Sequence, residues 1–141
     1  MNFSTINWLA VIACVVASMI IGSVWFAPKT FFPMWWRAIG KSDSDEPKML
    51  PGGMTWVLTI LAALVQAVFM SLMVTAMGSM TPGGATLVSG ATAGFILWLG
   101  FVAPSSLTNK LFSAQFTAWA LEAGNHLVTF VVMGAILGAW R

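Results

Sequence analysis

Residues 49–109 read MLPGGMTWVLTILAALVQAVFMSLMVTAMGSMTPGGATLVSGATAGFILWLGFVAPSSLTN, and this stretch of 61 residues contains no Asp, Glu, Lys or Arg. A helix needs about 20 apolar residues to cross a bilayer, so the stretch is too long for one crossing and suits two. Thr81-Pro82-Gly83-Gly84 supplies a turn near its middle. We therefore predict membrane-spanning helices at about 54–77 and 85–103, the latter ending at Pro104.

The rest of the chain also has the composition of an integral membrane protein. Charged residues make up 7% of the 141 residues, against roughly 25% in an average soluble domain. Hydrophobic residues make up 59%, and the mean hydropathy is +0.90. A soluble fold of this size could not bury that much apolar side chain. The composition thus excludes a soluble enzyme, a disordered chain and a disulfide-rich secreted module, and a net charge of +2 is too small for binding nucleic acid.

Two further apolar stretches predict the first and the last crossing. Residues 6–26 lack the basic start and the cleavage site of a signal peptide, so we expect a retained helix. Residues 119–140 carry Trp119 and Trp140 about 31 Å apart along a helix, which matches the hydrocarbon thickness. The prediction is an all-α integral membrane protein, with residues 1–141 forming a single transmembrane domain of four transmembrane helices.

Two polar segments, residues 29–53 and residues 105–118, lie between these helices. Residues 32–39 predict a short interfacial helix after the first crossing, because Trp and Arg side chains favour headgroup depth. Residues 105–118 alternate apolar and polar side chains at helical spacing, which predicts an amphipathic segment before the fourth crossing. The expected membrane-interface anchors are Trp25, Trp35, Trp36, Arg37, Trp119 and Trp140.

The basic residues are divided unevenly between the two predicted sides of the membrane. With four crossings, both polar segments share one side, and the other side holds only Arg141. The positive-inside rule then places the polar segments in the cytoplasm and both chain termini outside. The five basic residues on the cytoplasmic side are Lys29, Arg37, Lys41, Lys48 and Lys110.

The last predicted helix carries a stripe of polar side chains. Glu122, Asn125, His126 and Thr129 follow one another at i, i+3, i+4 and i+7, so they share a face. Glu122 is the only acid inside a predicted crossing, and His126 is the only histidine of the chain. Ionisable groups are costly in lipid, so the stripe should face other helices or water. Gln66, near the middle of the second crossing, is a candidate partner for it across the bundle.

Two interpretations of this polar stripe remain open. In the first, Glu122 marks a helix start, where acids are favoured, and His126 and Gln66 hydrogen-bond neighbouring helices as structural groups. In the second, Glu122 and His126 form a site for a proton, an ion or a ligand, with coupled protonation. The sequence shows no metal-ligand spacing, nucleophile with a base, or phosphate loop, so we expect no metal, no cofactor and no enzymatic activity.

Glycines spaced four residues apart occur on the third and fourth predicted helices, as Gly90/Gly94 and Gly134/Gly138. Such pairs let helices approach closely, either within a bundle or between protomers. Two functions fit these features. One is a small homo-oligomeric transporter or channel-like protein with a proton-sensitive Glu/His stripe, and the other is a non-enzymatic accessory or structural subunit of a larger membrane complex. The expected partners are membrane lipid and other membrane chains, and no nucleic acid.

Several motifs resemble a family of small bacterial membrane proteins catalogued as domain of unknown function 1761. They include Gly22-x-x-Trp25-Phe26-x-Pro28, Trp98-Leu-Gly100-Phe-Val-Ala-Pro104 and Ala123-Gly124-x-His126-Leu-Val. The resemblance covers nearly the whole chain, although Phe26 stands where the family often has Tyr and Asn125 stands where an aromatic residue often precedes the histidine. It implies a bacterial inner-membrane location and no established activity.

Overall fold

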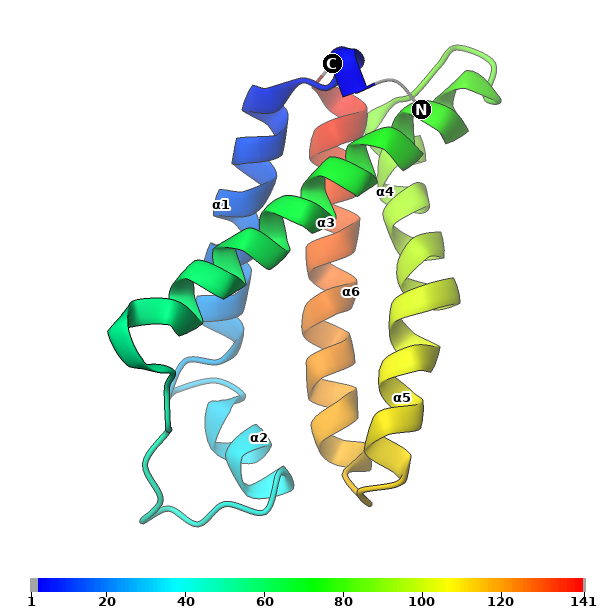
Figure 1. Ribbon diagram of the computed structural model, residues 1–141. Coiled ribbons are helices and arrows are strands. Elements are labelled where there is room, and N and C mark those ends of the chain that lie inside the picture. The colour runs from blue at the N-terminus through cyan, green and yellow to red at the C-terminus, as the bar shows by residue number, and fades with distance from the viewer. Residues whose placement is uncertain (1–2, 141) are drawn as a thin grey trace.

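The computed structural model describes residues 3–140, which form helices joined by turns and loops (Figure 1). No strand occurs within these residues, so the expected all-α class is confirmed for them. The α-helices are α1 (Trp8–Trp25), α2 (Phe32–Ala38), α3 (Met54–Ser79), α4 (Leu87–Leu97), α5 (Ala103–Leu111) and α6 (Phe116–Ala139). Short 3-10 turns at Phe3–Thr5 and Pro51–Gly53 and a π-helical turn at Trp98–Val102 complete the set.

Four continuous helical stretches are long and apolar enough to cross a membrane. They are Trp8–Trp25, Pro51–Ser79, Leu87–Leu111 and Phe116–Ala139. α1 begins and α6 ends at the same end of the bundle, while α2 lies at the opposite end, and α3 runs diagonally across the other helices (Figure 1). Arg141, which the sequence analysis places alone on one side, lies outside the described residues.

Local sequence signals explain where these helices begin. The Asn7 side chain caps α1 by accepting hydrogen bonds from the backbone N–H groups of Leu9 and Ala10, at 3.1 and 3.2 Å. Thr86 and Ser89 form a reciprocal capping box at the start of α4. The predicted turn before α4 contains Gly83 with φ of 90°, a backbone conformation that favours glycine.

The helix expected to end at Pro104 continues instead to Leu111, so this boundary is a correction. The π-helical turn at Trp98–Val102 precedes the proline, and the Ala103 N–H bonds to the Trp98 carbonyl five residues earlier. Pro104 then lies in the first turn of α5, directly after this π-helical turn, which accommodates the missing N–H and the ring of the proline within a continuing helix. The amphipathic segment therefore begins as a continuation of α4.

α4 and α6 are in direct backbone contact through the two glycine pairs. A methyl group built on Gly90 would overlap the Gly134 carbonyl oxygen and lie 2.9 Å from the Gly138 Cα atom. One built on Gly94 would lie 2.7 Å from the Phe130 carbonyl carbon. Both glycine faces are thus used inside one chain, and neither offers a surface for a second protomer, which removes the glycine argument for oligomers.

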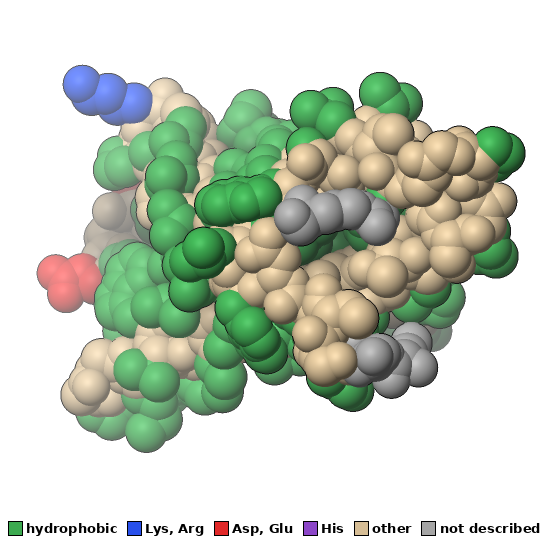
Figure 2. All heavy atoms as spheres, turned by 90° about the horizontal axis from the view of Figure 1, so that it is seen from above, with side chains coloured by type: hydrophobic (Ala, Val, Ile, Leu, Met, Phe, Trp, Pro, Cys, Tyr) green, Lys and Arg blue, Asp and Glu red, His purple; other side chains and the backbone are tan. Residues whose placement is uncertain are grey.

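The outer surface of the bundle is apolar. Seen from the end where α1 begins, hydrophobic side chains project around the helices (Figure 2). Val88 and Phe101 are 72% and 71% exposed, and Ile20 and Val24 of α1 are also exposed. An apolar exterior of this kind suits contact with lipid better than contact with water.

Candidate functional site

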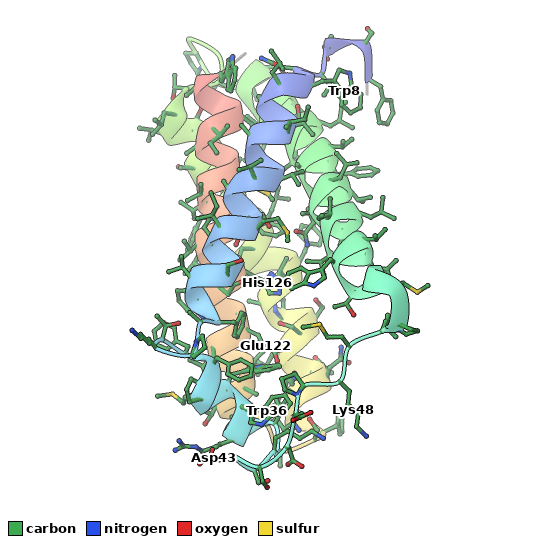
Figure 3. All side chains as sticks on the ribbon, turned by 90° about the vertical axis from the view of Figure 1, so that its left-hand side faces the viewer. Trp8, Trp36, Asp43, Lys48, Glu122 and His126 are labelled. Carbon is green, nitrogen blue, oxygen red and sulfur yellow. The ribbon has the colours of Figure 1, made fainter. Side chains whose placement is uncertain are left out.

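The polar stripe of α6 is divided between two environments. Glu122 lies nearer α2, and His126 lies one turn further into the bundle (Figure 3). Glu122 is bonded to side chains of α2 and α5, whereas Asn125, His126 and Thr129 line a cavity. The four residues share a helix face, as predicted, yet they do not form one continuous site.

Glu122 is held by two donors from other helices. Its Oε1 accepts a hydrogen bond from Trp35 Nε1 at 2.8 Å and forms an ion pair with Lys110 Nζ at 3.0 Å. Both charged side chains are only 24% exposed, and Lys110 Nζ also lies 3.5 Å from Gln115 Oε1. The cluster fastens α2 and α5 to the first turns of α6. Helical spacing in the sequence indicates Glu122 but not its partner Lys110, because the chain turns back between the two residues.

Two other tryptophans donate to the backbone of α6 in the same layer. Trp25 Nε1 donates to the Leu121 carbonyl oxygen at 3.0 Å, and Trp98 Nε1 donates to the Ala123 carbonyl oxygen at 2.9 Å. The Trp25 ring also faces Gly124, where an added Cβ atom would lie 3.0 Å from the indole. Trp98, which the sequence analysis did not select, therefore helps to position α6 from the π-helical turn.

The predicted interface anchors differ in their surroundings. Trp36 donates to the Ser42 carbonyl oxygen at 3.0 Å, and Trp119 donates to the Ala103 carbonyl oxygen at 3.2 Å. Trp140 is 48% exposed. Arg37 is exposed and pairs with Asp43 at 3.4 Å. The indoles of Trp25, Trp35, Trp36 and Trp119 thus bond to protein groups as well as lying near the helix ends.

A cavity of about 410 Å³ lies between α1, α3 and α6, next to the Glu122 cluster. Gln66 of α3 lines it together with Asn125 and His126, the side chains for which Gln66 was the candidate partner, although Asn125 Nδ2 has no partner among residues 3–140. His126 lies in the space between α1 and α3 (Figure 3). Seven of the thirteen lining residues have polar side chains: Ser18, Ser23, Thr59, Gln66, Asn125, His126 and Thr129. α1 contributes two serines that the sequence analysis missed, because single serines in an apolar helix give no distinctive signal.

The Asn125 side chain is the main unsatisfied group of the cavity. Asn125 is 9% exposed, and its Nδ2 is buried without a hydrogen-bond partner among the described residues. A buried donor without a partner costs about 1–3 kcal/mol, so such groups in native proteins usually bond to water or to a ligand. Because Asn125 lines the cavity, this unpaired donor lies in the cavity wall.

Seven polar side chains reach the cavity, but most of its wall surface is apolar, and residues 3–140 contribute no Asp, Glu, Lys or Arg side chain to it. The nearest charged groups are Glu122, one turn earlier on α6, and Lys110, which is paired with it. Neither α1 nor α3 contains a charged residue. Within residues 3–140, no group of three or more His, Cys, Asp or Glu side chains is arranged to hold a metal ion. The arrangement suits hydrogen bonding to a neutral molecule, with His126 as the one titratable side chain in the wall.

Comparison with known proteins identifies a family. The family described as "Protein of unknown function (DUF1761)" matches residues 9–138. No curated protein and no solved structure matches the chain. The matched residues include all of the cavity lining and the Glu122 cluster, and they leave out only the ends of the chain. On this evidence, and in agreement with the motifs seen in its sequence, the chain belongs to the DUF1761 family.

Proposed function

We propose that this protein is a small multi-pass membrane protein of transporter type, which binds a small molecule in the cavity between α1, α3 and α6. The single observation that carries this proposal is the cavity itself, since seven polar side chains line it in helices that are otherwise apolar. Polar groups at membrane depth are costly, and they are found mainly where they line a path or a site.

The proposed setting is the inner membrane of a bacterium, with both chain termini outside and α2 in the cytoplasm. Five of the six basic residues lie in the segments that share the α2 side, which supports this orientation. The cavity of one chain is small, so transport through a larger path would need two or more copies. Assembly would have to use surfaces other than the glycine faces, which α4 and α6 bury against each other.

His126 is proposed to make the cavity sensitive to protons. Imidazole is the side chain whose ordinary pKa lies between pH 5 and 8. The charged groups around it are Glu122 and its partner Lys110, and the neighbouring helices α1 and α3 contribute none. A proton taken up by His126 would therefore place a positive charge in a cavity that has no carboxylate in its wall. Glu122 acts in this scheme as a positioning residue for α2 and α5.

Cysteine labelling tests whether water and small solutes reach the cavity. Cys14 is the only cysteine of the chain and is buried, so a Cys14→Ala background is suitable. In this background Ser18→Cys should react with a water-soluble methanethiosulfonate reagent at least tenfold faster than the control Ile12→Cys, whose parent side chain lies on the exposed apolar face of α1. Ala63→Trp should slow the labelling of Ser18→Cys, because Ala63 lines the same cavity.

Equal labelling of the Ser18 and Ile12 variants would refute a solute-accessible cavity.

The proposed proton sensitivity of His126 has its own control. The labelling rate of Ser18→Cys between pH 5 and 8 should differ between the protein with His126 and the His126→Gln variant, beyond the pH dependence of the thiol that both share. Identical profiles would remove His126 from the proposal and leave the cavity.

A second candidate function is that of an accessory subunit of a larger membrane complex. The observation that favours it is that Glu122, the one acid within the candidate membrane-spanning helices, is bonded to Trp35 and Lys110 rather than open to the cavity. Mass measurement in mild detergent after extraction from the native membrane separates the two candidates. A complex of identical chains supports the transporter proposal, and a stable complex with a different protein supports the subunit proposal.

A further inference from the structure

We propose that the cavity binds the head of a lipid quinone, an uncharged molecule with a flat, carbonyl-bearing ring and a long apolar tail. The inference rests on the proposed function, because this molecule would be the small molecule that the cavity takes. Three independent features support it: the unpartnered donor in the cavity wall, the absence of charged side chains among the lining residues, and an apolar groove beside the cavity.

The head of the ligand is defined by the polar groups of the cavity. Asn125 Nδ2 is a buried donor without a partner, and the adjacent His126 can donate a second hydrogen bond. Both residues therefore suit carbonyl oxygens. Among the described residues 3–140, no carboxylate, ammonium or guanidinium lines the cavity, so a charged head would be buried without a counter-charge, at high cost.

The aromatic lining and the volume of the cavity suit a flat ring. Phe26 and Trp56 contribute aromatic side chains to its wall, and aromatic faces pack well against planar rings. The volume of about 410 Å³ lies in the range of roughly 300–1,000 Å³ that is usual for small-molecule sites.

The tail is defined by a groove that adjoins the cavity. A second hollow of about 450 Å³ lies along α1 and shares Met19 and Ser23 with the cavity. Its other lining residues are apolar and include Ile20, Val24 and Ile60, which are 58%, 60% and 46% exposed. The cavity thus adjoins an apolar groove on the outer surface, the side that would face lipid. A molecule with a polar ring and an apolar tail fits both parts at once.

The depth of the cavity argues against a phospholipid headgroup. Asn125 and His126 lie about 5 Å further along α6 than Glu122, since each residue rises 1.5 Å. The Glu122–Lys110 pair and the Trp35 indole occupy the layer nearer the helix end, where a charged headgroup would sit. The head bound in the cavity would therefore lie below headgroup depth, which an uncharged lipid tolerates and a charged one does not.

The inference is tested with the full-length protein in phosphatidylcholine nanodiscs, using decylubiquinone as the probe and saturable quenching of tryptophan fluorescence as the readout. We expect Asn125→Leu, which keeps the size of the side chain and removes the donor, to weaken binding about five- to tenfold, the effect of one hydrogen bond. Ile20→Trp should also weaken binding because it fills the groove. The matched controls are Asn109→Leu on the exposed side of α5 and Ile12→Trp on α1 outside the groove, and both should bind as the parent does.

Each other outcome overturns a defined part of the reasoning. Binding that Asn125→Leu and Ile20→Trp leave unchanged would show that the probe lies elsewhere. Displacement of the probe by an equal concentration of monodecanoylglycerol would assign the site to an acylglycerol and overturn the quinone. If decylubiquinone does not bind while Ser18→Cys is still labelled rapidly, the inference fails and the proposed solute-accessible cavity stands. If labelling fails as well, both fail.

Discussion

Replacing Gly90 by alanine tests whether the backbone contact between α4 and α6 holds the bundle together. The added methyl group would overlap the Gly134 carbonyl oxygen and lie 2.9 Å from the Gly138 Cα atom. These are backbone atoms, so they cannot rotate away, and the two helices must separate. Overpacking of this kind costs about 1–3 kcal/mol, and the better helix propensity of alanine returns only about 1 kcal/mol. We expect a net loss of up to about 2 kcal/mol in the free energy of unfolding.

Gly22→Ala is the matched control for this substitution. Gly22 lies within α1, and an added Cβ atom there would meet nothing within 4 Å. The same chemical change should therefore stabilise the protein by about 0.5–1 kcal/mol, the gain in helix propensity alone. Unfolding by sodium dodecyl sulfate, followed by circular dichroism in mild detergent, measures both variants against the parent.

A double variant sharpens the test. Gly90 and Gly134 meet at the same point, so one separation of the helices accommodates both methyl groups, and Gly90→Ala/Gly134→Ala should lose less stability than the sum of the single variants. A Gly90→Ala protein as stable as the Gly22→Ala protein would refute the packing argument. Strict additivity would show that the two glycines do not share a contact.

Two further predictions concern the Glu122 cluster and the orientation in the membrane. A double-mutant cycle of Glu122→Gln with Lys110→Met should give a coupling energy of about 1–2 kcal/mol. The two charged groups are 3.0 Å apart and their side chains are about three-quarters buried, so the coupling should lie between that of surface and that of fully buried ion pairs. A coupling energy near zero in the same unfolding assay would contradict this. Reporter fusions at Asp45 and after Trp140 should report the cytoplasm and the outside, respectively, and a C-terminal fusion in the cytoplasm would overturn the proposed topology.

The number and the placement of the long helices could be predicted from the sequence because they follow from local properties. A backbone that crosses lipid must satisfy its own hydrogen bonds, so apolar stretches of sufficient length become helices. The short helix around Trp35 and the turn at Gly83 also depend on nearby residues alone, and both occur in the structure. The predicted helix end at Pro104 was wrong. A proline within a helix can be accommodated when the preceding turn changes its hydrogen bonding, and here that turn is π-helical.

The candidate site, in contrast, depended on tertiary structure. Helical spacing placed Glu122 and His126 on one face of α6. It could not show that Glu122 bonds to Lys110 and Trp35, or that His126 lines a cavity between α6, α1 and α3. Spacing also left open whether the glycine pairs meet within one chain. The physical reason is that position on a helix follows from a 3.6-residue repeat, whereas partners from other helices follow from crossing angles and from turns that reverse the chain. Composition and charge thus predicted a helical membrane protein, and only the packing of its helices decided that a cavity with seven polar side chains in its wall lies beside an apolar groove.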